Sequence, residues 1–181
     1  MFSREKPISK TTYELAKIFA GLIVDGSTSL NSDLLQATKV PVDPESLEGT
    51  RFWLECLIFV WFLADGIIAT DFAAHEDAFR KKLTLCLYDF LQETGASLDY
   101  LLQLDHHVAA RFTEYSQTFL AATKSKRPLA LGSLAWQHIA ATEERNFIGA
   151  SLLAAMAGDV IASLTEVASQ YEVIEDSGDT S

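Results

Sequence analysis

The sequence predicts an all-α fold, a single-domain bundle of about six helices that is soluble in water. Leu and Ala are frequent along the whole chain, and both are good helix formers. No proline interrupts residues 45–127, so long helices can run through that region. No segment alternates β-branched and polar residues in the way of a half-buried strand. A length of 181 residues with 49% hydrophobic side chains fits one globular domain with a substantial core.

The first helix is expected over residues 11–24. Thr11 and Glu14 have the spacing of a capping box at its start, and Gly26 is the expected stop. A short helical turn over residues 31–38 is expected to precede a linker that contains two prolines.

The second helix is expected to begin at Asp43, with Pro44 in its first turn, and to run to about Ile68. The third is expected over residues 72–94, with Gly95 just past its end.

The remaining elements follow from caps and breakers in the second half of the chain. A fourth helix should start after Ser97 as N-cap and run to about Thr123, followed by a basic, proline-ended loop at 124–128. The later expectations are a fifth helix at 129–142, a turn at 143–146 and a sixth helix at 147–171. Residues 1–171 thus form one domain, and residues 172–181 are expected to be an acidic disordered tail.

The charge balance argues against a nucleic-acid partner. The chain has 14 Lys and Arg against 25 Asp and Glu, a formal net charge of −11, which repels phosphate backbones. The two cysteines are far apart in sequence and lie in apolar runs, and no apolar segment directly follows the charged N-terminus. These features predict buried free thiols and a cytoplasmic location.

Residues 52–70 are nearly long enough to cross a membrane. However, Glu55 and Asp65 lie within them, and a charged side chain at the centre of a membrane helix costs about 2.5–3.5 kcal/mol. We therefore expect a helix at the centre of a soluble bundle, and we expect no membrane partner.

A mixed stripe runs along this second helix, and it gives the predicted interaction site. At 100° per residue the charged positions fall on one side of an otherwise apolar helix, together with two large apolar residues: Arg51, Glu55, Ile58, Phe62 and Asp65. Neighbouring segments can cover this stripe. Alternatively, it is an exposed apolar spot ringed by charge, which is typical of a partner or dimer surface.

The fourth helix carries the clearest polar anomaly. Asp105 lies in the middle of the predicted core stripe formed by Leu98, Leu101, Leu102, Val108, Ala109, Phe112 and Phe119. A buried carboxylate needs a partner, and His138 lies among apolar residues of the fifth helix. A contact between the two would satisfy both groups, although the sequence does not establish it. His107, Arg111 and Glu114 share the opposite side, which is expected to be solvated.

The sixth helix is rich in Gly, Ala and Ser. Small side chains allow another helix to approach closely, within the chain or across a dimer interface.

The chain has none of the glycine-rich phosphate loops, nucleophile elbows, calcium loops or zinc-protease motifs that mark common enzyme and metal sites. We therefore expect no metal or other cofactor, and catalysis is a minority interpretation. The leading hypothesis is a non-catalytic protein–protein interaction module, such as an adaptor, chaperone, inhibitor or oligomer subunit, whose acidity favours basic partners. The alternative is a bundle that binds a small molecule or metal at a carboxylate and histidine site in its core.

Overall fold

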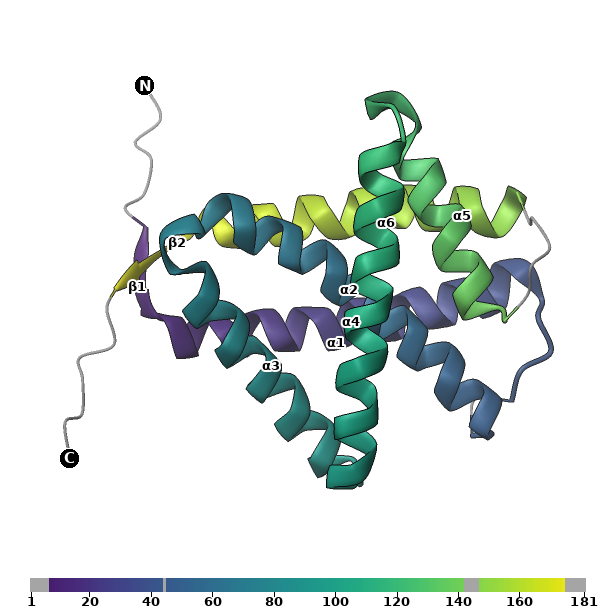
Figure 1. Cartoon of the computed structure of the whole chain (residues 1–181), viewed down its shortest axis with the longest axis horizontal. Helices are drawn as coiled ribbons and strands as arrows, with labels where there is room; N and C mark the ends of the chain where they lie inside the picture. Colours follow the sequence, from purple (N-terminus) through teal and green to yellow (C-terminus); the bar gives the residue numbers. More distant parts are fainter. Residues whose placement is uncertain (1–6, 44, 142–146, 175–181) are drawn as a thin grey trace.

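The computed structural model describes residues 7–43, 45–141 and 147–174, and it confirms the all-α bundle (Figure 1). The described residues form six α-helices, two short 3-10 helices and a two-stranded sheet. In chain order these are β1 (Ile8–Thr11), α1 (Thr12–Thr38), α2 (Leu47–Asp71), η1 (Ala73–His75), α3 (Glu76–Glu93), α4 (Leu98–Ala121), η2 (Lys124–Lys126), α5 (Arg127–Ile139), α6 (Phe147–Ala168) and β2 (Tyr171–Ile174).

Helix α2 is the central element of the bundle. It packs against each of the other five α-helices, and most of its residues are buried. Helices α1 and α6 run side by side along the long axis, and α4 crosses in front of them (Figure 1). The expectation that the apolar segment 52–70 forms the central helix of a bundle is therefore confirmed.

Two helices, α2 and α6, are long and apolar enough to cross a membrane by length and composition. They differ in how far the fold covers them. In the most apolar 18 residues of each helix, 67% are buried in α2 and only 28% in α6. Helix α6 is thus an apolar helix that lies largely at the surface.

Helix α1 is longer than the sequence predicts, because Gly26 does not end it. The helix continues to Thr38 and closes at Lys39, whose backbone is left-handed with φ 53°. Leu30 and Leu34 extend its buried face past the glycine, and packing of this face outweighs the low helix propensity of Gly. The separate turn expected at 31–38 is the last part of the same helix.

Several predicted caps are confirmed. Thr11 and Glu14 form the capping box of α1, and the Ser97 side chain accepts from the Tyr100 backbone N–H at the start of α4. Gly95 follows α3 with φ 102°, a conformation that glycine adopts without strain.

The predicted start of α2 at Asp43 is wrong. Ser46 is the N-cap and accepts from the Gly49 backbone N–H, whereas Asp43 accepts from the Glu45 backbone N–H in a local turn. Pro44 lies outside the described residues.

The other helix bounds differ by a few residues from the expected ones. Helix α3 starts after a 3-10 turn, α5 begins within the expected basic loop, and the expected turn at 143–146 lies outside the described residues. Residues 172–174 were expected in a disordered tail, but they belong to β2, which pairs in parallel with β1. Residues 175–181 lie outside the described part of the chain.

Two glycines bring α5 and α6 into close contact. A Cβ atom at Gly132 would overlap the backbone carbonyl of Ala150, and one at Gly149 would overlap the Trp136 ring. The expectation that small residues of the sixth helix allow close packing is confirmed here within one chain.

Candidate functional site

The predicted stripe of α2 lies against neighbouring helices. Glu55 and Ile58 are 1% and 0% exposed, so they cannot form a surface spot. Phe62 is half-buried, and its ring packs against those of Phe112 and Tyr115 at centroid distances of 5.5 and 5.1 Å. The interpretation of the stripe as an exposed apolar spot is therefore wrong for Ile58, because α4 covers this side of α2.

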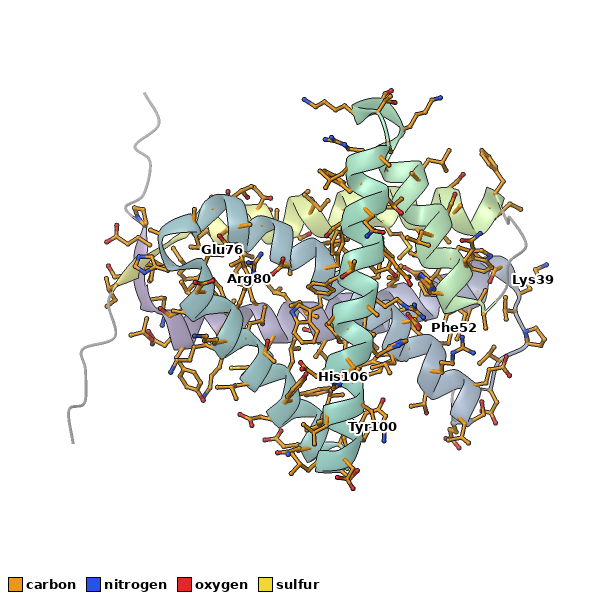
Figure 2. All side chains as sticks on the ribbon, viewed as in Figure 1. Lys39, Phe52, Glu76, Arg80, Tyr100 and His106 are labelled. Atoms are coloured by element: carbon orange, nitrogen blue, oxygen red, sulfur yellow. The ribbon has the colours of Figure 1, made fainter. Side chains whose placement is uncertain are left out.

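The two ends of the stripe are more accessible. Asp65 is half-buried and accepts two hydrogen bonds from Arg80 of α3, at 2.6 and 2.8 Å. Arg80 also contacts Glu76 one turn earlier, at 2.5 Å, and Figure 2 labels both residues on α3. Arg51 is exposed. The charges of the stripe thus mostly hold helices together.

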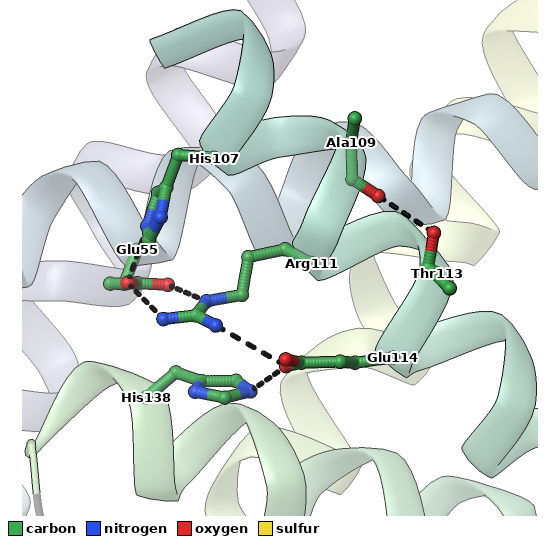
Figure 3. A network of polar contacts seen from close by, with 7 residues as sticks. All are labelled: Glu55, His107, Ala109, Arg111, Thr113, Glu114 and His138. Atoms are coloured by element: carbon green, nitrogen blue, oxygen red, sulfur yellow. Dashed lines mark hydrogen bonds and ion pairs between the residues drawn. The ribbon is translucent and has the colours of Figure 1, made fainter. Parts of the chain in front are cut away.

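A polar network joins α2, α4 and α5 (Figure 3). The guanidinium of Arg111 donates to both carboxylate oxygens of Glu55, each at 3.1 Å, and His107 Nε2 lies 2.9 Å from Glu55 Oε1. On its other side Arg111 donates to Glu114 at 3.2 Å, and His138 Nε2 lies 2.7 Å from the same Glu114 oxygen. The network therefore connects α4 to α2 through Arg111 and His107, and α4 to α5 through Glu114 and His138.

Burial and pairing compete in the pKa values of this network. Burial favours the neutral form of Glu55, but hydrogen bonds from Arg111 and His107 outweigh it, so its pKa is lowered. The pKa of His138 is also lowered, first by burial and then by the positive charge of Arg111, against the opposing effect of Glu114. Glu55 is thus held ionised and His138 is held neutral.

We interpret the network as a structural link between α2, α4 and α5. Arg111 lies between the carboxylates of Glu55 and Glu114 and pairs with both. Within the described ranges, no group of three or more His, Cys, Asp or Glu side chains is placed to hold a metal ion.

Sequence reasoning missed this network because the charged side of α4 was expected to face solvent. Two features pointed to it. Glu55 is a lone carboxylate within an apolar run and needs a cationic partner, and His107, Arg111 and Glu114 are spaced so that one helix face presents all three.

The contact between Asp105 and His138, which the sequence left open, does not form. Asp105 is exposed and accepts a hydrogen bond from the Tyr88 hydroxyl at 2.9 Å, whereas His138 contacts Glu114. Helix α4 is rotated relative to the prediction. Leu98 and Leu102 are exposed, and the buried residues are Leu101, Leu104, Val108 and Tyr115. Both cysteines are free and buried, as expected.

An open groove lies between α1 and α6, with a volume of about 360 Å³. Its apolar lining comes from both helices: Leu22, Leu30, Met156, Val160 and Leu164. Its other lining residues, among those the structure describes, include three exposed carboxylates, Asp25, Asp33 and Asp159, and no Lys or Arg. None of the three forms a hydrogen bond or ion pair with another described residue. The groove therefore combines an apolar floor with an unbalanced negative rim.

A second hollow, between α1 and α3, is larger at about 450 Å³ but mixed in character. Its lining includes a cation, Lys17, together with three carboxylates, Asp25, Asp89 and Glu93, and Lys17 also stacks on the Tyr13 ring. Of these two hollows, only the α1–α6 groove has carboxylates and no cation among its described lining residues.

No family model, curated protein or solved structure matches the chain.

Proposed function

We propose that the chain is a non-catalytic protein–protein interaction module that docks another polypeptide in the α1–α6 groove. The observation that carries the proposal is this open groove, with its apolar floor, beside a helix that is apolar enough to cross a membrane but mostly uncovered. Apolar surface of this kind is typical of binding sites, because a folded chain otherwise buries it.

We propose docking in the α1–α6 groove and no longer on the predicted stripe of α2. Glu55 and Ile58 are buried beneath α4, and Asp65 is paired with Arg80. Adaptors, chaperones, inhibitors and oligomer subunits all fit a groove of this kind.

We further propose a cytoplasmic location, which two free buried cysteines support.

A photo-crosslinking side chain at a groove position tests this function. Ser163 lines the groove and is exposed, so a benzoyl-phenylalanine side chain at that position would face a docked polypeptide. Ile161 is a matched control, because it is exposed on the same helix and does not line the groove. After irradiation of intact cells that produce the chain, we expect protein adducts from position 163 and few from position 161.

The outcomes separate clearly on a denaturing gel followed by mass spectrometry. Adducts with a defined polypeptide at position 163 support docking in the groove. Equal adduct formation from both positions, or adducts with lipid alone, would contradict it.

A further inference from the structure

We infer that the polypeptide docked in the α1–α6 groove is a cationic amphipathic helix of another protein. This inference rests on the proposed function and adds the chemistry of the partner. It is based on three features of the groove that match such a helix: its shape, its apolar lining and the negative charge of its rim.

The shape of the groove suits a helical segment. On α1 the lining extends from Leu22 to Asp33, which at 1.5 Å per residue is about 16 Å, or about three helical turns. The floor is formed by α1 and α6, which run in opposite directions (Figure 1), so an apolar helix face can pack along the channel between them.

The rim sets the charge of the occupant. Asp25 and Asp33 are exposed on α1, and Asp159 is exposed on α6. Since they have no cationic partner among the described residues, a ligand that carries Lys or Arg on both flanks would supply the missing charges. Asp25 and Asp33 are about 12 Å apart along the helix axis, so basic residues seven or eight positions apart on the ligand match them.

The same charges disfavour other occupants. If two copies of the chain packed groove to groove, the carboxylates of both rims would meet without a cation, in a chain whose net charge is already −11. An anionic membrane surface meets the same repulsion. A cationic helix is the occupant that removes it.

Three synthetic peptides test the inference against the full chain by fluorescence anisotropy. The first has Leu on one helical face and Lys on both flanks. The second replaces each Lys by Glu, and the third replaces each Leu by Ser. We expect the first peptide to bind, and to bind at least tenfold more weakly in about 0.5 M salt than in about 0.05 M salt. The second and third should not bind measurably.

A charge-matched pair of variants assigns the binding to the groove. In the triple variant Asp25→Asn, Asp33→Asn, Asp159→Asn, the first peptide should bind at least tenfold more weakly. The control Asp71→Asn, Asp77→Asn, Glu166→Gln removes the same charge from exposed positions that do not line the groove, and it should bind like the wild type. Circular dichroism verifies that both variants keep their helical content.

Each other outcome overturns the inference in a different way. Equal binding of the second peptide shows a groove that does not select positive charge, and the docking function itself would then stand. Equal binding of the third peptide, or equal loss in both triple variants, shows unspecific charge attraction.

Doubling of the solution mass without peptide, if the groove variant abolishes it, identifies a second copy as the occupant. Binding to phosphatidylserine vesicles that the groove variant abolishes identifies a membrane. If no peptide binds, the cationic helix is excluded, while the adducts from position 163 still decide whether the groove docks a polypeptide.

Discussion

Glu55 is a carboxylate in the middle of the bundle, and its neighbours determine whether it stabilises or destabilises the fold. It is 1% exposed, so its desolvation is nearly complete. Two parallel hydrogen bonds from Arg111 offset part of the free-energy cost of this desolvation. Their geometry also holds both side chains in place. We infer that the main effect of the Glu55–Arg111 pair is to fix the orientation of α4 on α2. Its net contribution to the free energy of unfolding is small by comparison.

Removal of Arg111 should therefore be far more damaging than removal of the whole pair. In Arg111→Met we expect the free energy of unfolding to fall by about 3–5 kcal/mol, because Glu55 is left buried without its main partner. In the double variant Glu55→Leu, Arg111→Met, most of this loss should be recovered, since no charge is left unpaired between α2 and α4. Urea denaturation followed by circular dichroism measures both. A double variant that is no more stable than Arg111→Met would contradict this interpretation.

At the residue scale, sequence reasoning located the right residue types but paired them wrongly. Glu55, His107, Arg111 and His138 were all singled out, yet Asp105 was expected to be the buried carboxylate. The error has a physical cause. Ion pairs form across helices, and their partners depend on how each helix is rotated about its axis, which a single sequence does not fix when two faces are similarly apolar.

At the element scale, helix α4 illustrates this ambiguity. One face carries Leu98 and Leu102, and the other carries Leu104 and Tyr115, so periodicity alone does not select the buried side. Two helix starts, at Thr11 and Ser97, were predicted correctly from their caps, whereas the start of α2 was not. The caps at Thr11 and Ser97 are local interactions, which a few neighbouring residues determine, whereas the rotation of α4 depends on α2 and α5.

The contact between α5 and α6 depends on a missing side chain. Gly132→Ala should lower the free energy of unfolding by about 1–3 kcal/mol, because the new Cβ would overlap the Ala150 carbonyl and force the helices apart. Gly66→Ala is the matched control. Gly66 lies in α2 with open space around its Cβ position, so alanine should raise the free energy of unfolding by up to about 1 kcal/mol.

Thermal unfolding under identical conditions compares the two alanine variants. The expected order of melting temperatures is Gly66→Ala at the top, then wild type, then Gly132→Ala. If Gly132→Ala were as stable as Gly66→Ala, the close approach of α5 and α6 would be refuted.

At the scale of the whole molecule, the fold class was predictable because composition and the position of prolines restrict the chain to helices. The pairing of strand β1 with strand β2 was not predictable in this way. Strands β1 and β2 are only four residues each and pair residues more than 160 positions apart, for example Ser9 with Glu172. Short strands of this kind leave little trace in periodicity, so residues 172–174 of the second strand were assigned to an acidic tail by their composition, and Tyr171 to the end of the sixth helix.

The whole-molecule packing also predicts how the two most apolar helices respond to charge. Ile58 of α2 is 0% exposed, whereas Ile161 of α6 is 39% exposed. In a bundle folded in water, Ile58→Glu should lower the free energy of unfolding by about 4 kcal/mol or more, because it buries an unpaired charge. Ile161→Glu should change it by at most about 1 kcal/mol, because its carboxylate reaches solvent.

A chain that crosses a membrane would respond differently. There, both substitutions would place a charge in lipid at a cost of about 2.5–3.5 kcal/mol each. Sedimentation in detergent-free buffer, followed by urea denaturation of the soluble fraction, distinguishes the two cases. We expect the wild type and Ile161→Glu to stay in the supernatant with similar unfolding midpoints, and Ile58→Glu to aggregate or unfold. A wild-type chain that requires detergent, or equal damage from both substitutions, would show that α6 is covered by lipid. The groove beside it would then lie at a bilayer and could not receive a cationic helix from solution.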